Sequence, residues 1–80
     1  MLRIAKQTRL KPDEIISKAS AYFGKGGENL TEMERNPCCI SFEGAGGYVS
    51  ISIADEDKHR VVDAETREFE YQIKRFLELI

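Results

Sequence analysis

Apolar and polar residues alternate in two short stretches in the middle of the chain, from Cys38 to Glu43 and from Tyr48 to Ile53. Alternation with a period of two is typical of strands that bury one face and expose the other. The segment 44–47 between them is Gly-Ala-Gly-Gly, and glycine supplies the backbone angles of a tight turn. The pattern therefore predicts an antiparallel hairpin. Its buried face is expected to carry Cys38, Ile40, Phe42, Val49, Ile51 and Ile53.

The opposite face of this hairpin has small and polar side chains, so we expect no second layer to cover it. Those side chains belong to Cys39, Ser41, Glu43, Tyr48, Ser50 and Ser52. Tyrosine is favoured at binding surfaces because its ring buries apolar area while its hydroxyl keeps a hydrogen-bond partner. We interpret this face as a candidate contact surface for a protein partner, a ligand or a second copy of the chain. The alternative is a plain solvated face.

A helix is predicted before the hairpin, from about Pro12 to Phe23. Proline at the first helical position loses no hydrogen bond, and Asp13 and Glu14 place negative charge at the positive end of the helix dipole. The buried stripe of this helix is expected to consist of Ile15, Ala19, Tyr22 and Phe23. Gly24 is expected to end the helix in the left-handed conformation.

A second helix is predicted from Thr66 to the C-terminus, and it has the strongest periodic pattern in the chain. Its apolar residues recur at i, i+4, i+7, i+8 and i+11, so they share one helix face. They are Phe69, Ile73, Phe76, Leu77 and Ile80. This face is expected to pack on the core. Tyr71 lies off the stripe and is expected, together with Leu79, to extend an exposed patch.

Two less regular segments before the hairpin, 2–9 and 28–35, are interpreted as strands. In the second of them, Leu30 and Met33 are three residues apart and do not fit one strand face. This spacing predicts an irregular edge strand with a bulge. The dipeptide Asn36-Pro37 then predicts a turn into the hairpin.

After the hairpin, a turn is predicted at 55–57 and a short strand at 59–64, where adjacent Val61 and Val62 leave the buried face undecided. The whole chain, 1–80, is thus predicted to be a single α+β domain. Its element order is β-α-β-β-β-β-α, with both helices on one face of a four- to five-stranded antiparallel sheet. In outline this order resembles one repeat of the TATA-binding protein fold or a minimal helix-grip domain. The resemblance is one of topology and implies no function.

Charge and length exclude several classes of partner. The chain has 80 residues and a formal net charge of −2, from 12 basic and 14 acidic residues that are interspersed. A chain with charges distributed in this way lacks the basic stripe of a nucleic-acid-binding protein and the polybasic cluster of a membrane contact. No apolar segment is long enough to span a bilayer, and residues 1–6 are too short and too polar for a signal peptide. A cytoplasmic location is therefore expected.

The two cysteines are the basis of the one alternative function that involves catalysis. Adjacent strand residues point to opposite faces, so Cys38 and Cys39 are expected to be unbonded, reduced thiols. His59 is the only histidine, and it would lie beside the hairpin if its strand pairs with residues 48–53. A thiol-dependent enzyme using Cys38 or Cys39 with His59 is then the alternative function. No third residue that would orient the histidine can be named, so we favour a non-catalytic domain.

No cofactor and no metal are predicted. Two adjacent cysteines and one histidine are too few, and wrongly spaced, for a zinc site. The acidic segment 55–57 lacks the ligand spacing of an EF-hand. The glycine-rich segments 24–27 and 44–47 do not stand between a strand and a helix, as a phosphate-binding loop does. The strand 47–51 resembles part of the RNP1 strand of RRM domains, but only Tyr48 is aromatic on that face.

Overall fold

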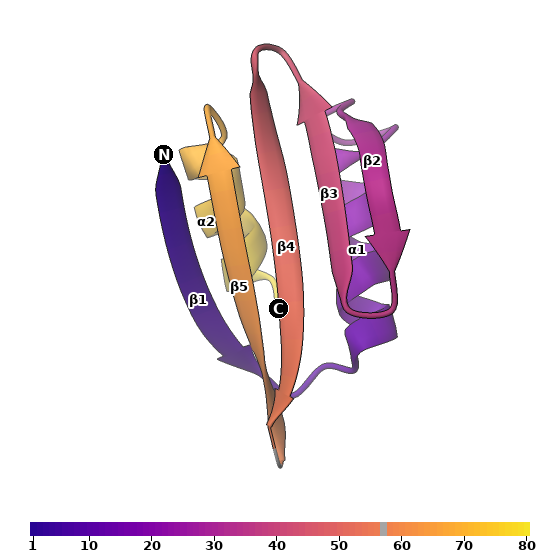
Figure 1. Cartoon of the computed structure of the whole chain (residues 1–80), viewed down its shortest axis with the longest axis vertical. Coiled ribbons are helices and arrows are strands. Elements are labelled where there is room, and N and C mark those ends of the chain that lie inside the picture. Colours follow the sequence, from indigo (N-terminus) through magenta and orange to yellow (C-terminus); the bar gives the residue numbers. More distant parts are fainter. Residues whose placement is uncertain (57) are drawn as a thin grey trace.

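The computed structural model describes residues 1–56 and 58–80. It has two layers, a five-stranded antiparallel sheet and two helices on one face of that sheet (Figure 1). In chain order the elements are β1 (Leu2–Thr8), α1 (Pro12–Phe23), β2 (Thr31–Asn36), β3 (Cys39–Gly44), β4 (Gly47–Glu56), β5 (His59–Arg67) and α2 (Glu70–Glu78). The predicted α+β class and element order are confirmed.

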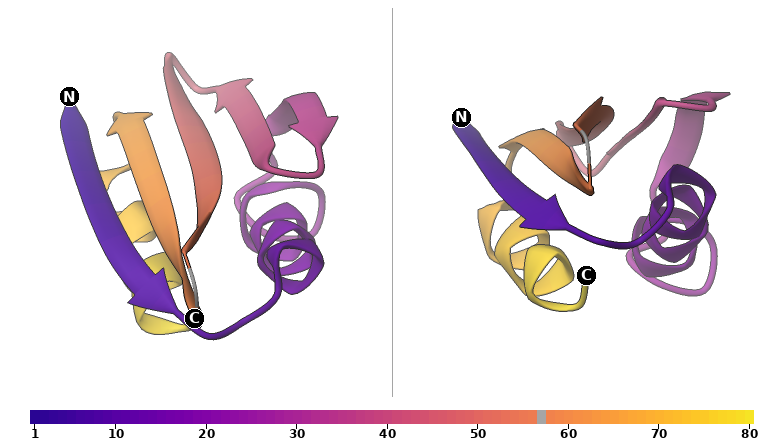
Figure 2. Two further views of the ribbon diagram at one scale, coloured as in Figure 1. Left: turned by 60° about the horizontal axis from the view of Figure 1, so that its bottom comes forward. Right: turned by 90° about the horizontal axis from the view of Figure 1, so that it is seen from below.

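The strands lie in the order β1-β5-β4-β3-β2, and every neighbouring pair is antiparallel. Strands β2 to β5 follow one another as hairpins, and β1 is added at the far edge beside β5. The chain therefore crosses from one edge of the sheet to the other after β1. It makes this crossing through α1, and both helices lie on the same side of the sheet (Figure 2). Helix α1 contacts β3 and α2 contacts β5, so each helix covers one half of that face.

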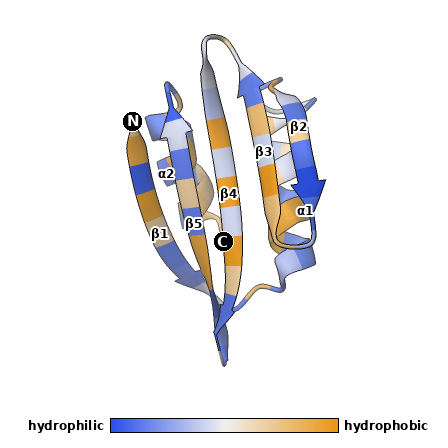
Figure 3. Cartoon of the chain, viewed as in Figure 1, coloured by the Kyte–Doolittle hydropathy of each residue, from blue (hydrophilic) through white to orange (hydrophobic). Residues whose placement is uncertain are grey.

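The hairpin of β3 and β4 buries the predicted face from Ile40 onward. Ile40 pairs with Ile51 and Phe42 with Val49, and these side chains are at most 1% exposed. Along β4, apolar and polar positions alternate visibly (Figure 3). The turn is shorter than predicted, because Gly44 pairs with Gly47 and leaves only Ala45 and Gly46 in the loop, both with positive φ. Two consecutive residues of positive φ match the right-handed twist of the flanking strands.

Aromatic rings join the two helices to the sheet. The ring of Phe23 on α1 lies 5.7 Å from that of Phe42 on β3 and 5.5 Å from that of Phe76 on α2. Around these rings the core continues through Ile15, Ile16, Ala19, Leu30, Ile40, Val49, Ile51, Ile53, Val62, Ala64, Phe69, Ile73 and Leu77. Of the two adjacent valines on β5, Val62 faces this core and is fully buried, whereas Val61 faces the other side.

Helix α1 spans the predicted residues, but two details of its prediction are wrong. Ile16, which was not expected in the buried stripe, is buried. Tyr22, which was expected there, is only half-buried at the margin of the core. Gly24 has φ −84° rather than a left-handed conformation, because its N–H still donates the helical hydrogen bond to the Ser20 carbonyl at 2.9 Å. The left-handed residue comes later, at Gly26 with φ 97°.

Helix α2 begins at Glu70 and not at Thr66, because β5 is longer than predicted. Thr66 pairs with Leu2 of β1 and with Val49 of β4. It is fully buried, and its Oγ1 donates a hydrogen bond of 2.7 Å to the Tyr48 carbonyl. Strand pairing on both sides thus extends the sheet into the segment that the helical pattern had included. The predicted apolar stripe of the helix still packs on the core.

The edge strand β2 is irregular, as predicted. Its register against β3 shifts between Glu32 and Glu34, and Met33 at the bulge is 56% exposed. Leu30, just before the strand, is buried at 7% exposure. At the other end of the meander, the predicted turn at 55–57 falls partly inside β4, which runs to Glu56, and residue 57 lies outside the described residues. Within the described ranges, no helix has the length and apolar character to cross a membrane.

Candidate functional site

The sheet face opposite the helices carries all the residues that the sequence assigned to the contact surface. Side chains alternate along each strand, so the register places Cys39, Ser41 and Glu43 of β3 beside Ser52, Ser50 and Tyr48 of β4. The same register continues to Asp63, Glu65 and Arg67 of β5. None of these side chains belongs to the buried core. The face of the sheet that bears these rows is called the uncovered face below.

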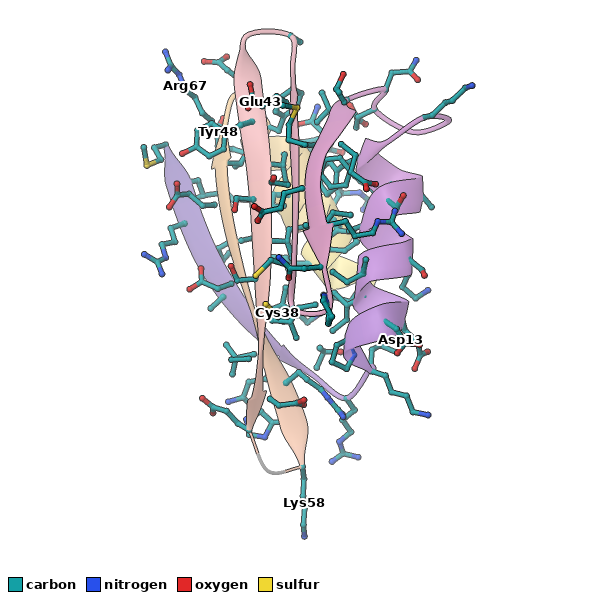
Figure 4. The ribbon with its side chains drawn as sticks, turned by 45° about the vertical axis from the view of Figure 1, so that its right-hand side comes forward. Asp13, Cys38, Glu43, Tyr48, Lys58 and Arg67 are labelled. Carbon is teal, nitrogen blue, oxygen red and sulfur yellow. The ribbon has the colours of Figure 1, made fainter. Side chains whose placement is uncertain are left out.

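The uncovered face is hollowed at the end where β3 turns into β4. The hollow has a volume of about 630 Å³. It is lined by Thr31, Met33, Glu43, Gly44, Gly46, Gly47, Tyr48 and Arg67. Three of these residues are glycines, which place no side chain in the space. Glu43, Tyr48 and Arg67 lie together at this end of the molecule (Figure 4).

Tyr48 is held in place across the strands. Its hydroxyl donates a hydrogen bond of 2.7 Å to Oε2 of Glu65, which lies diagonally across on β5. The hydrogen bond to this carboxylate raises the pKa of Tyr48, with further contributions from burial and from the charge of Glu65. The ring is therefore positioned in the free protein, with its polar end already partnered.

The Tyr48–Glu65 hydrogen bond predicts a specific titration. A pKa raised by folding means that the stabilisation is complete below the unfolded value of about 10 and is lost as the pH rises through the higher folded value. Replacement of Glu65 by glutamine should lower the pKa of Tyr48 towards that ordinary value, because the carboxylate no longer disfavours the phenolate. Near-ultraviolet absorbance titration, with the Tyr48→Phe variant subtracted, measures it. An unchanged titration midpoint in Glu65→Gln would contradict the observed contact.

The charges on the uncovered face are mainly acidic. Arg3 of β1 donates two hydrogen bonds to Asp63, of 3.1 and 2.9 Å, and this pairing lowers the pKa of Asp63. Glu43 is exposed and lines the hollow, and Glu34 occupies the same face of β2 because it pairs with Ser41. Arg67 is the basic side chain at the hollow itself. The hollow therefore contains one carboxylate, that of Glu43, and one guanidinium, that of Arg67.

The structure does not bring a histidine to the cysteines. Cys39 pairs with Ser52, and Ser52 with Asp63, which is four residues from His59 along β5. Four strand residues span about 13 Å. The neighbour of His59, Lys58, lies at the tip of the molecule, away from Cys38 (Figure 4). Nε2 of His59 instead lies 3.8 Å from a carboxylate oxygen of Glu56.

The two thiols themselves are closer than the sequence predicted. Cys38 is not a strand residue facing the core but lies exposed in the turn between β2 and β3. Turn geometry removes the strand alternation that would separate the pair, and the two Sγ atoms are 3.0 Å apart. Both cysteines are free thiols. Across residues 1–56 and 58–80, no group of three or more His, Cys, Asp or Glu side chains could hold a metal ion.

Several residues of the site were missed from the sequence. Arg67 lies in the segment that was interpreted as the start of the last helix, and Glu65 lies just before it, so their positions in the sheet were not expected. Met33 was recognised as part of an irregular edge strand, but its face depends on the bulge. Tyr71 and Leu79 are exposed, as expected, yet Tyr71 lies on α2 and Leu79 just beyond its end, both in the helix layer, so they do not extend the uncovered face.

A scan against protein-family models and a search of curated proteins both found no match to the chain.

Proposed function

We propose that the chain is a non-catalytic binding module that holds a protein partner on the uncovered face of its sheet. The observation that carries this proposal is the hollow, where Met33, Tyr48 and Arg67 converge from three strands. Methionine, tyrosine and arginine are among the residue types enriched in protein interfaces, and a few such anchors supply most of the binding energy. The hollow is open to solvent, so a partner's surface can reach all three side chains.

Preorganisation of the site supports the proposal. Tyr48 is already hydrogen-bonded to Glu65, so a partner that packs on its ring pays little entropy to order it. Met33 is 56% exposed on the edge strand, and its flexible thioether can adapt to a partner's surface. In the free chain, the exposed Met33 side chain leaves apolar surface in contact with water. A partner that covers this surface removes the unfavourable contact.

The acidic surroundings indicate what the partner carries. Glu34 and Glu43 favour basic side chains on a partner, while Arg67 in the hollow favours one carboxylate or backbone carbonyl. The same acidic groups disfavour nucleic acid phosphates. A second copy of the chain is the other partner to consider, since Arg67 of one copy can face Glu34 or Glu43 of another. The thiol-enzyme alternative lacks its base, because His59 is distant from both thiols. We also propose a cytoplasmic location, in keeping with two free thiols.

A photo-cross-linking experiment tests the proposal. A photoreactive amino acid in place of Ser52, which is exposed on the uncovered face, should cross-link the partner in living cells. The same amino acid in place of Ser17, which is exposed on α1, is the matched control for the helix layer. The cross-linked product should be either a second copy of the chain or a protein with a basic surface.

The Tyr48→Ala variant makes this test specific. Truncating an interface anchor costs about 2 kcal/mol, so binding should weaken about thirty-fold and the Ser52 cross-link should be largely lost. Circular dichroism should show an unchanged fold, because Tyr48 is outside the core. Equal cross-linking in Tyr48→Ala, or cross-linking from Ser17 alone, would contradict the proposal.

A further inference from the structure

The turn between β2 and β3 brings two thiols together in a defined arrangement. Oδ1 of Asn36 accepts hydrogen bonds from the Cys38 N–H at 3.1 Å and from the Cys38 thiol at 3.2 Å. The Cys39 Sγ lies 3.0 Å from the Cys38 Sγ. Cys38 is exposed and Cys39 is half-buried. The pair thus has one thiol that a small reagent can reach and a second thiol in contact with it.

We propose that Cys38 and Cys39 form a reversible oxidation site, which closes to an internal disulfide by exchange with a low-molecular-weight disulfide such as glutathione disulfide. Cys39 lies on the uncovered face, where it pairs with Ser52, but the oxidation proposed here does not depend on the binding of a partner there. Its basis is the contact between the two sulfur atoms together with the exposure of Cys38.

The exchange proceeds in two steps. The Cys38 thiolate attacks one sulfur of glutathione disulfide, forms a mixed disulfide and releases one glutathione thiolate. Cys39 then loses its proton, attacks the Cys38 sulfur, forms the Cys38–Cys39 bond and releases the second glutathione thiolate. The two protons of the cysteines pass through solvent to the two released thiolates. The protein loses two electrons, and glutathione disulfide gains them.

The roles of the two thiols follow from their surroundings. The hydrogen bond with Cys38 and partial burial raise the pKa of Cys39, which lowers its thiolate fraction, and its partial burial limits access by reagents in solution. Cys39 does not have to meet a reagent in solution, because the sulfur that it attacks is that of the neighbouring Cys38. Cys38 therefore reacts first and Cys39 resolves the mixed disulfide.

The disulfide formed in this way is expected to be easily reduced. Adjacent Cα atoms are about 3.8 Å apart across a trans peptide. Disulfides usually join Cα atoms roughly 4.4–6.8 Å apart, so a bond between neighbouring residues is strained. Strained, exposed disulfides have high reduction potentials and belong to the labile class. The site is suited to reversible oxidation rather than to permanent stabilisation.

Formation of the Cys38–Cys39 disulfide is expected to change hydrogen bonds in the neighbouring strands. The Cys38 carbonyl accepts a hydrogen bond of 2.7 Å from the Ile53 N–H, and Asn36 at the end of β2 holds the Cys38 N–H. A change in the Cys38–Cys39 backbone must alter both contacts. Oxidation is therefore expected to shift the amide signals of Asn36 and Ile53.

Mass spectrometry of the intact chain after incubation with glutathione disulfide tests the proposal. The parent chain should lose two hydrogens and carry less glutathione than either single-cysteine variant, and dithiothreitol should restore it. The Cys38→Ser and Cys39→Ser variants provide matched controls, because each has one thiol and cannot close the ring. Cys38→Ser should react more slowly than Cys39→Ser, and each should retain one glutathione.

Two outcomes would overturn the proposal. The first is a parent chain that accumulates glutathione adducts without forming the internal bond. The second is oxidation to covalent dimers between chains in place of a monomer. Amide spectra provide a second readout on the same samples, and signals of Asn36 and Ile53 that do not move in the oxidised monomer would also contradict it.

Discussion

Replacing Phe76 by alanine should lower the free energy of unfolding by about 3–5 kcal/mol, one of the two largest effects that we expect in this chain. Phe76 is 1% exposed on α2, and its ring lies 5.5 Å from Phe23 and 5.7 Å from Tyr22 on the other helix. Truncation removes the ring that joins α2 to α1 and leaves a cavity between them. Urea denaturation followed by circular dichroism measures the loss.

Leu79 provides the matched control for Phe76. It lies just beyond the end of the same helix and is 59% exposed. The Leu79→Ala change should therefore alter the free energy of unfolding by less than about 0.5 kcal/mol. If Phe76→Ala were as mild as Leu79→Ala, the helix would not be packed on the sheet as observed.

Replacing Ile51 by alanine should cost about 2–5 kcal/mol, because a fully buried side chain on the central strand β4 is cut back. Ser52, the next residue, provides the control. It faces the other side of the sheet and is exposed, so Ser52→Ala should be nearly neutral. The contrast between neighbours reports the strand register, because a slip by one residue exchanges the two faces.

The same denaturation experiment applies to this pair. A large loss in Ser52→Ala with a small one in Ile51→Ala would mean that the hairpin is inverted. In that case the uncovered face would be the core, and the proposed binding surface would not exist.

The hairpin could be predicted from the sequence because two local signals agree on it. Alternation fixes which residues share a face, and the glycine-rich turn fixes which strands pair. Together they placed Ile40 and Val49 in the core and the serines on the opposite face. These signals need no knowledge of distant parts of the chain.

The boundary between β5 and α2 could not be predicted in the same way. Thr66 precedes a strong helical pattern, so local propensity favours a helix start there. In the protein it pairs with Leu2 and Val49, which are distant in sequence. Strand pairing that closes the sheet outweighs the local preference, and it places Glu65 and Arg67 on the uncovered face.

The cysteines illustrate a second limit. The sequence interpretation started the strand at Cys38, but the turn that begins at Asn36-Pro37 extends through Cys38 and moves the strand start to Cys39. A shift of one residue at a strand end changes which atoms meet. Here it turns two thiols that were expected on opposite faces into a pair in contact.

Hydroxyl-radical footprinting of the chain, alone and with the partner captured through Ser52, tests the central claim most directly. Met33 and Tyr48 report on the uncovered face, and Tyr71, which is 71% exposed on α2, reports on the helix layer. Partner binding should protect Met33 and Tyr48 from oxidation and leave Tyr71 unchanged. Protection of Tyr71 while Met33 and Tyr48 stay reactive would place the binding surface on the helices and contradict the proposed function.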